Sequence, residues 1–276
     1  TGIYKGDFLA TSLFVDISGF SSMADALMKH GQHGAEVLVW IMNQIFDMLN
    51  HQILSQGGFI VGFAGDAVTA IFPQEGDTAK SIRRALEAAR GFQQQMSRLP
   101  NIDTVYGSFP ISAKAGLAHG YVNWGILRSK DQKRATYYFS GEPIQDSAEA
   151  EHHAGAGEII LTQGIYEKLS EEIRCHTRDE FHLLLEITQD APVAQPISLI
   201  EPDISILRIF FPDALLVPNV PNEFRQVVNL FIQLPDLPST ELEKFMNALF
   251  EVQARCGGLI SRVDYGDKGC NLLLFW

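Results

Sequence analysis

The stretch FLATSLFVDISGF, residues 8–20, joins an apolar run to a carboxylate and a turn of small residues. The mostly apolar residues 8–15 predict a buried strand of a sheet. Asp16 follows this run, and Ser18-Gly19 then provides residues that suit a tight turn. The stretch therefore predicts a central strand that carries Asp16 at its carboxyl end.

The segments after this strand alternate between helical and strand patterns. Apolar residues recur at helical spacing over residues 35–55 and again over residues 79–99. Between them, two short apolar runs, residues 59–63 and 67–72, flank Ala64-Gly65-Asp66 and predict a β-hairpin with Asp66 at its tip. Strand-like segments follow near residues 111–119, 121–127 and 135–139. This order predicts an α+β fold, a ferredoxin-like βαββαβ domain with a mixed sheet and helices packed on it.

The chain also contains an internal repeat. GGFI at residues 57–60 and GD at residues 65–66 recur as GGLI at 257–260 and GD at 266–267, and LFVD at 13–16 recurs as LFIQ at 230–233. A helix is expected over residues 239–255, between the two parts of the second copy. We therefore expect a complete first domain over residues 1–200, a proline-containing linker over 201–222, and the beginning of a second, truncated copy over 223–276. The second copy stops in mid-sheet, which predicts a fragment of a longer protein with its last strand, residues 271–276, exposed.

The overall composition excludes several classes of partner. The chain has 276 residues, of which 46% are hydrophobic, and 21 Lys and Arg against 33 Asp and Glu give a net charge of −12. An acidic chain offers no broad basic face for nucleic acid or for an anionic membrane surface, and its apolar runs are shorter than the roughly 20 residues that span a bilayer. Three widely spaced cysteines without a CxxC pair indicate the reducing cytoplasm.

Asp16 and Asp66 are the candidate metal ligands. In a βαββ sheet the end of the first strand and the tip of the next hairpin are adjacent, and two carboxylates there suit Mg²⁺ carried with a phosphate substrate. Alternatively, Asp16 caps the following helix and Asp66 is a turn residue. The repeat favours the metal site, because the second copy has the neutral Gln233 in place of Asp16. One carboxylate pair in two similar copies predicts a pseudo-symmetric dimer with a single metal site.

The motifs FVDISGF at residues 14–20 and FAGDA at residues 63–67 resemble the class III adenylyl and guanylyl cyclase catalytic domain. The tandem arrangement and DKGC at residues 267–270 are most similar to the bicarbonate-responsive soluble adenylyl cyclases. This resemblance implies two Mg²⁺ or Mn²⁺ ions bound by the catalytic carboxylates of Asp16 and Asp66, with help from the Ile17 carbonyl. It also implies that Arg262 contacts the base. The phosphates would be bound by Ile17, Ser18, Gly19, Phe20 and Lys114.

The resemblance implies that ATP is converted to cyclic AMP and pyrophosphate by two-metal catalysis. Family members supply an Asn and an Arg, four residues apart, from a helix of the partner domain. The corresponding positions of the first copy hold Gln145 and Glu149. We therefore expect the first copy to be the metal-donating half, with ATP and a second cyclase-like domain as partners. The fragment alone, including any homodimer of it, is expected to be inactive.

Two other functions remain open at this point, and one more is disfavoured by the sequence. A catalytically silent cyclase-like domain would bind a nucleotide or an anion and regulate attached domains without turnover. A diguanylate cyclase or a polymerase-palm enzyme shares the βαββαβ fold but would need a GG[DE]EF-type turn, which Gly65-Asp66-Ala67 does not provide. A structural interaction domain is the third alternative.

Overall fold

The computed structural model describes residues 4–188, 201, 203–216, 227–235, 237–266 and 269–276. These residues form two compact units. The larger unit comprises Phe8–Val122 with Gly141–Ile197, and the smaller unit comprises Thr1–Asp7, Asn123–Ser140 and Ser198–Trp276. The expected boundaries at 1–200 and 223–276 are not those of the units, because residues 123–140 group with the C-terminal part of the chain. Of the expected linker, residues 202 and 217–222 lie outside the described residues, and the described remainder contains a short helix and a 3₁₀ turn.

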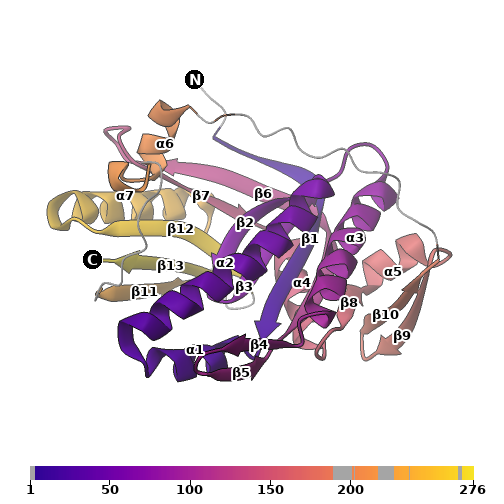
Figure 1. The fold of residues 1–276 in the computed structure, drawn as a ribbon. Helices are drawn as coiled ribbons and strands as arrows, with labels where there is room; N and C mark the ends of the chain where they lie inside the picture. The colour runs from indigo at the N-terminus through magenta and orange to yellow at the C-terminus, as the bar shows by residue number, and fades with distance from the viewer. Residues whose placement is uncertain (1–3, 189–200, 202, 217–226, 236, 267–268) are drawn as a thin grey trace. The chain divides into compact units, whose positions relative to one another are not determined.

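The larger unit has the expected α+β architecture (Figure 1). Its sheet has the order β2-β3-β1-β6-β8-β10-β9. The last part of β6, from Asn123 to Arg128, belongs to the smaller unit and pairs there with β7 (Ala135–Ser140). The pair β6 and β8 is parallel and the pair β1 and β3 is antiparallel, so the sheet is mixed. In chain order the elements are β1 (Lys5–Ser18), α1 (Phe20–Met28), α2 (Gly31–Ser55), β2 (Phe59–Ala64), β3 (Ala67–Pro73), α3 (Thr78–Ser97), β4 (Asn101–Thr104), β5 (Gly107–Pro110), β6 (Ser112–Arg128), α4 (Glu142–His152), β8 (Ile159–Thr162), α5 (Gln163–Leu169), β9 (Ile173–Arg178) and β10 (Phe181–Ile187).

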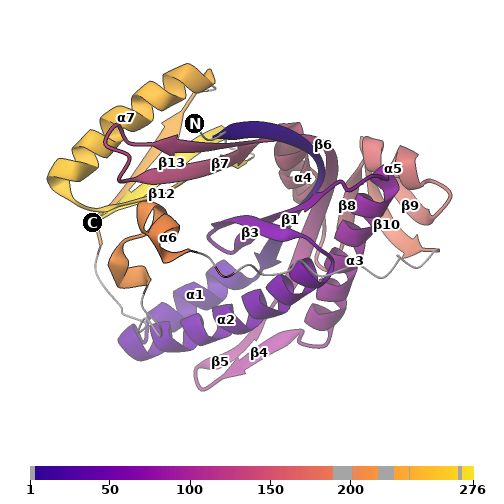
Figure 2. The same ribbon diagram turned by 90° about the horizontal axis from the view of Figure 1, so that it is seen from above.

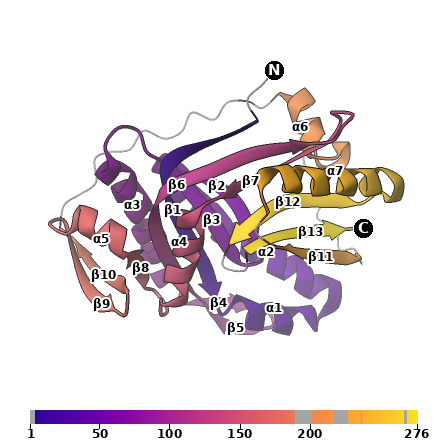
Figure 3. The same cartoon turned by 180° about the vertical axis from the view of Figure 1, so that it is seen from behind.

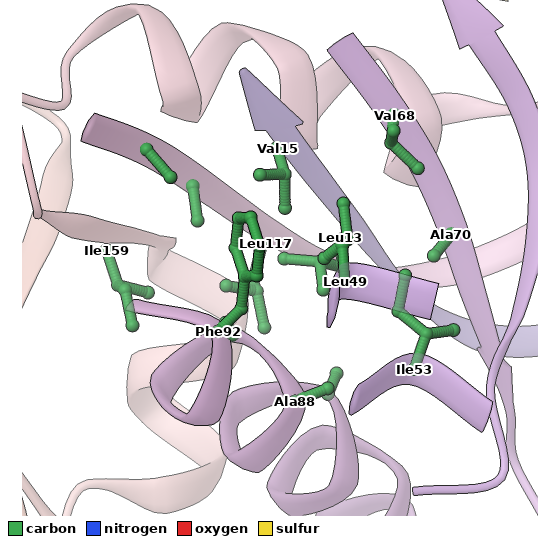
Figure 4. Close-up of a cluster of buried hydrophobic side chains, with 14 of the residues drawn as sticks. Leu13, Val15, Leu49, Ile53, Val68, Ala70, Ala88, Phe92, Leu117 and Ile159 are labelled. Atoms are coloured by element: carbon green, nitrogen blue, oxygen red, sulfur yellow. The ribbon is translucent and has the colours of Figure 1, made fainter. Parts of the chain in front are cut away.

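Helices cover both faces of this sheet. On one face, Leu49 of α2 and Phe92 of α3 meet Leu13 of β1 and Leu117 of β6, and all four side chains are at most 1% exposed (Figure 4). Burying each of these side chains stabilises the fold by roughly 1.5–3 kcal/mol. On the opposite face lies α4, as the view from behind shows (Figure 3). The periodic apolar residues of α2, α3 and the strands therefore form one continuous core.

Three local features differ from the sequence-based expectations. β1 continues through Asp16 to Ser18, so Asp16 lies within the strand and not after it. The helix α1 was considered only in the alternative in which Asp16 caps it, and it is short, with nine residues of which Met23 and Leu27 are buried. The two strands expected around Gly120 are the single strand β6, since Gly120 marks the close approach of the Pro143 ring and not a turn.

The smaller unit contains a three-stranded antiparallel sheet of order β11-β13-β12. Its elements are α6 (Ile204–Phe210), a 3₁₀ turn (Asp213–Leu215), β11 (Asn229–Leu234), α7 (Ser239–Cys256), β12 (Leu259–Gly266) and β13 (Gly269–Phe275). The helix α7 lies along this sheet (Figure 2). Its Leu242, Met246 and Phe250 pack in one buried cluster with apolar residues of β12 and β13. The expectation that the last strand is an exposed edge is wrong: β13 is the central strand, hydrogen-bonded on both sides.

The repeat in the sequence extends to strand register. In the larger unit Ala70 pairs with Leu13 on one side and Ile60 on the other. In the smaller unit Leu274 pairs with Leu230 and Ile260 in the same way, and a one-residue bulge follows in both hairpins. The second hairpin then continues two residues further along β13, to Gly269. Counted along the strand, Asp66 therefore corresponds to Cys270 and not to Asp267, which lies outside the described residues.

Among the described residues, no helix is both long and apolar enough to cross a membrane.

Candidate functional site

The pairing of β1 with β3 brings Asp16 and Asp66 to the same end of the sheet. Val15 pairs with Val68, so the next residue along β1, Asp16, lies at the level where β3 begins after the Gly65-Asp66 turn. Gly65 has a φ of 69°, a left-handed conformation that glycine adopts without strain. The Asp16 side chain is 27% exposed, and thus partly buried yet open on one side. The sequence-based prediction that these two carboxylates converge agrees with this register.

The electrostatic surroundings of Asp16 are dominated by negative charge. Partial burial raises the pKa of Asp16 first, and the nearby carboxylates of Glu151 and Asp66 raise it further. The cationic groups of Lys114 and His152 lower this pKa, but by less. A cation bound near Asp16 would be stabilised by this excess of negative charge.

Lys114 of β6 lies between two of these carboxylates. Its Nζ is 2.6 Å from Glu151 Oε1 and 3.8 Å from Asp16 Oδ2. Glu151 of α4 was not identified from the sequence, although its side chain is only 4% exposed. Glu151 shares a helix face with the buried Ile144, Ser147 and Ala148. This spacing could have identified it from the sequence, because a carboxylate on the buried face of a helix requires a partner.

The turn after β1 leads directly into α1. Gly19 is the N-cap residue with a φ of 90°, and a Cβ added to it would lie 2.3 Å from the Pro110 carbonyl oxygen, so a glycine is required here. The cap makes no side-chain hydrogen bond, which rules out the alternative that Asp16 caps this helix. A helix N-terminus that no side chain caps has backbone amides that suit an anionic ligand such as a phosphate. Ile17, Ser18 and Phe20 flank this glycine in the sequence, and their contact with phosphate stays a prediction.

The donor set fits a divalent cation that arrives with its substrate. In the described part of the chain, no group of three or more His, Cys, Asp and Glu side chains is arranged to hold a metal ion. The two carboxylates and the Ile17 carbonyl would supply oxygen ligands, and phosphate oxygens and water would complete the coordination. This division of ligands is typical of Mg²⁺.

The remaining predicted residues have other surroundings. Arg262, in the smaller unit, donates hydrogen bonds from Nε and Nη2 to Asp264 Oδ1, at 3.2 and 2.8 Å. Gln145 and Glu149 are exposed on α4, one helical turn apart. Glu149 lies beside His152 and His153, with nitrogen–oxygen distances of 3.8 and 3.6 Å. None of these contacts tests the roles that the resemblance implies for these positions.

Comparison with known families and proteins agrees with this geometry. Residues 9–188 match the family model of the adenylate and guanylate cyclase catalytic domain. The chain is 28% identical over 157 residues to adenylate cyclase type 10 of Rattus norvegicus and 30% identical over 162 residues to that of Oryctolagus cuniculus. Each alignment covers 56% of this chain, which spans about a tenth of the length of these relatives.

Solved structures agree on the fold. The adenylyl cyclase CyaB from P. aeruginosa superposes with a TM-score of 0.55 at 20% identity, over 68% of this chain and 99% of that one. The guanylate cyclase domain of RhGC from Catenaria anguillulae gives a TM-score of 0.55 at 16% identity, over 66% and 99%. The family match covers well over half of the sequence and includes both motifs that carry Asp16 and Asp66. We conclude that the chain belongs to the adenylate and guanylate cyclase catalytic domain family.

Proposed function

We propose that this chain supplies the metal-binding half of a nucleotidyl cyclase that converts ATP to cyclic AMP and pyrophosphate. The observation that carries the proposal is the placement of Asp16 beside the Asp66 turn, in surroundings rich in negative charge. The name of the relatives, adenylate cyclase type 10, supports ATP over GTP as the proposed substrate. Arg262 stays the predicted base contact, with its guanidinium held by Asp264.

In this mechanism the residues of the chain bind and orient the substrate. Two Mg²⁺ or Mn²⁺ ions would activate the ribose 3′-oxygen and stabilise the charge that develops on the phosphates. Asp16 and Asp66 would hold these ions together with the Ile17 carbonyl. The amides of Ile17–Phe20 and the Lys114 ammonium would hold the triphosphate so that its α-phosphorus faces the ribose.

A second cyclase-like domain would complete the site. Stabilising the transition-state phosphate requires a cation, and Glu149 carries the opposite charge at the position that matches the family's Arg. Gln145 takes the position of the family's Asn. A homodimer of this chain would repeat the same deficiency. We therefore expect the chain alone to bind metal and ATP without turnover.

Direct binding measurements test the metal-binding half. Mn²⁺ binding is followed by electron paramagnetic resonance and ATP binding by calorimetry, for the parent chain and for Asp16→Asn and Asp66→Asn. We expect each variant to weaken Mn²⁺-dependent ATP binding at least tenfold, about 1.4 kcal/mol. The matched control, Asp47→Asn, changes an exposed carboxylate on α2 and should leave binding unchanged. Unchanged binding in both site variants would overturn the metal assignment.

A cyclic AMP assay tests the need for a second domain. The parent chain with Mn²⁺ and ATP should produce no more cyclic AMP than Asp16→Asn does. Production well above that control would show that Gln145 and Glu149 do not prevent catalysis.

A catalytically silent sensor is the alternative function, favoured by the same two positions on α4. It predicts ATP binding but no turnover, even when this chain is joined to a second cyclase domain that carries the Asn and Arg pair. Cyclic AMP formation by such a joined protein would exclude it. The free thiols of Cys175 and Cys256 are consistent with the proposed cytoplasmic location.

A further inference from the structure

Lys114 is shared unequally between two carboxylates. Its ammonium is in direct contact with Glu151, at 2.6 Å, whereas Asp16 lies at 3.8 Å, the outer limit of an ion pair. Glu151 is almost fully buried, while Asp16 remains partly open. A buried carboxylate depends on its counter-ion more strongly than a partly solvated one does, because water cannot replace the lost interaction. Lys114 is therefore held at the Glu151 side of the site.

The helix that carries Glu151 is fixed tightly to the sheet. A Cβ added to Gly116 would lie 2.4 Å from the backbone nitrogen of Glu151 and 2.1 Å from the carbonyl oxygen of Ser147. Ser147 also shares a 2.8 Å hydrogen bond with Ser12 of β1, and both serines are fully buried. These contacts place the Glu151 carboxylate within a narrow range of positions relative to β1 and β6.

We infer that Glu151 is a positioning residue: it keeps the Lys114 ammonium away from Asp16, so that Asp16 stays available to a divalent cation and Lys114 stays available to the triphosphate. This inference rests on the proposed function. Without Glu151, the nearest carboxylate to Lys114 is that of Asp16. An ammonium paired with Asp16 would compete with the metal ion and would no longer face the phosphates.

The variant Glu151→Asp tests this inference at constant net charge. The shorter side chain no longer reaches Lys114, so the affinity for Mn²⁺ without nucleotide and the affinity for ATP without metal should both fall, by about tenfold. A purely through-space effect of charge predicts no change in either affinity. Unchanged affinities in a folded Glu151→Asp protein would overturn the inference.

The variant Glu151→Gln is a second test, in which the loss of charge and the capture of Lys114 change the affinity for ATP in opposite directions. Removing a negative charge should by itself strengthen the binding of ATP without metal, whereas capture of Lys114 by Asp16 should weaken it. We expect weakening, and stronger ATP binding would contradict the inference. Glu142→Gln is the matched control, because it makes the same charge change at an exposed position on α4 and should leave both affinities unchanged.

Removing the competing ammonium should restore metal binding. The double variant Glu151→Gln with Lys114→Met has no cation to pair with Asp16, so its Mn²⁺ affinity should return to within about twofold of the parent value, while ATP affinity stays low. A double variant with Mn²⁺ affinity as low as Glu151→Gln would contradict the proposed competition.

A measurement without metal or nucleotide separates this inference from the proposed function. Acetylation of Lys114, followed by mass spectrometry, should stay slow in Asp16→Asn because Glu151 still holds the ammonium. Lys114 should react several-fold faster when Glu151→Gln is added to Asp16→Asn. Slow acetylation in both proteins would overturn the role of Glu151 even if ATP binds. Conversely, the expected acetylation pattern in a chain that binds neither Mn²⁺ nor ATP would count against the proposed function alone.

Discussion

The sheet of β1, β2 and β3 and the sheet of β11, β12 and β13 share strand order and register, but they differ in what covers them. Leu13 is fully buried between strands and helices, whereas Leu230, at the same place in the ladder, is 44% exposed. Phe231 and Leu273 pair on the face away from α7 and are 61% and 40% exposed. The comparison shows that the alternation of apolar residues specifies the strand pairing, while burial depends on which helices pack on the sheet.

The largest expected difference is the loss of stability when the equivalent residues Leu13 and Leu230 are replaced by alanine. Leu13→Ala leaves a cavity in a fully packed core and should lower the free energy of unfolding by about 2–5 kcal/mol. Leu230→Ala should cost less than about 1 kcal/mol, because much of the side chain is already in water. Denaturant unfolding followed by circular dichroism measures both. Equal losses would mean that the second sheet is as well packed as the first.

Asp16 and Gln233 occupy matching positions of the two copies. Exchanging their residue types should weaken binding in the first copy without creating a site in the second. Asp16→Gln should weaken Mn²⁺-dependent ATP binding at least tenfold, about 1.4 kcal/mol, since an amide replaces an anionic ligand. Gln233→Asp should not add a second Mn²⁺ site, because Cys270 takes the register of Asp66 in the second hairpin. Titration with Mn²⁺ counts the sites. A second site in Gln233→Asp would show that one carboxylate is sufficient.

Two ion pairs extend the comparison to pH dependence. In the larger unit both oxygens of Glu172 accept hydrogen bonds from Arg83, and this pairing lowers the pKa of Glu172. Because the folded-state pKa of Glu172 is lowered, the ion pair stabilises the fold at pH values above the ordinary carboxyl pKa near 4.5. This stabilisation is lost as the pH falls through the folded-state pKa. Glu172→Gln should therefore cost about 1 kcal/mol at neutral pH and little in acid.

The matched pair of the smaller unit should matter less. Lys130 and Glu251 are 74% and 60% exposed, so water and salt screen their interaction. Glu251→Gln should leave the unfolding curve unchanged between acid and neutral pH. A pH-dependent loss as large as that of Glu172→Gln would contradict the role of burial in this contrast.

Long periodic segments were predictable and short or interrupted ones were not. The helices α2 and α3 and the β2–β3 hairpin follow from periodicity and from the Gly-Asp turn, as does the convergence of Asp16 and Asp66. The short helix α1 and the strands β9 and β10 were not predicted. The helix has only nine residues and β9 is mostly polar, whereas β10 does alternate, with apolar residues at 181, 183, 185 and 187, a signal that the sequence analysis did not use. Gly120 suggested a turn because a sequence does not show that a proline of a distant helix packs against it.

By itself, the sequence determined the α+β class, the cyclase-like motifs around Asp16 and Asp66, and the repeat that pairs Asp16 with Gln233, because these depend on neighbouring residues and on local periods. Only the tertiary structure decided that Asp66 corresponds in register to Cys270, that β13 is a central strand, and that Glu151 holds Lys114 beside Asp16. The physical reason is that register and ion pairing depend on which distant segments pack together. Lys114 and Glu151 lie on different elements, and their interaction exists only because α4 packs closely against β1 and β6.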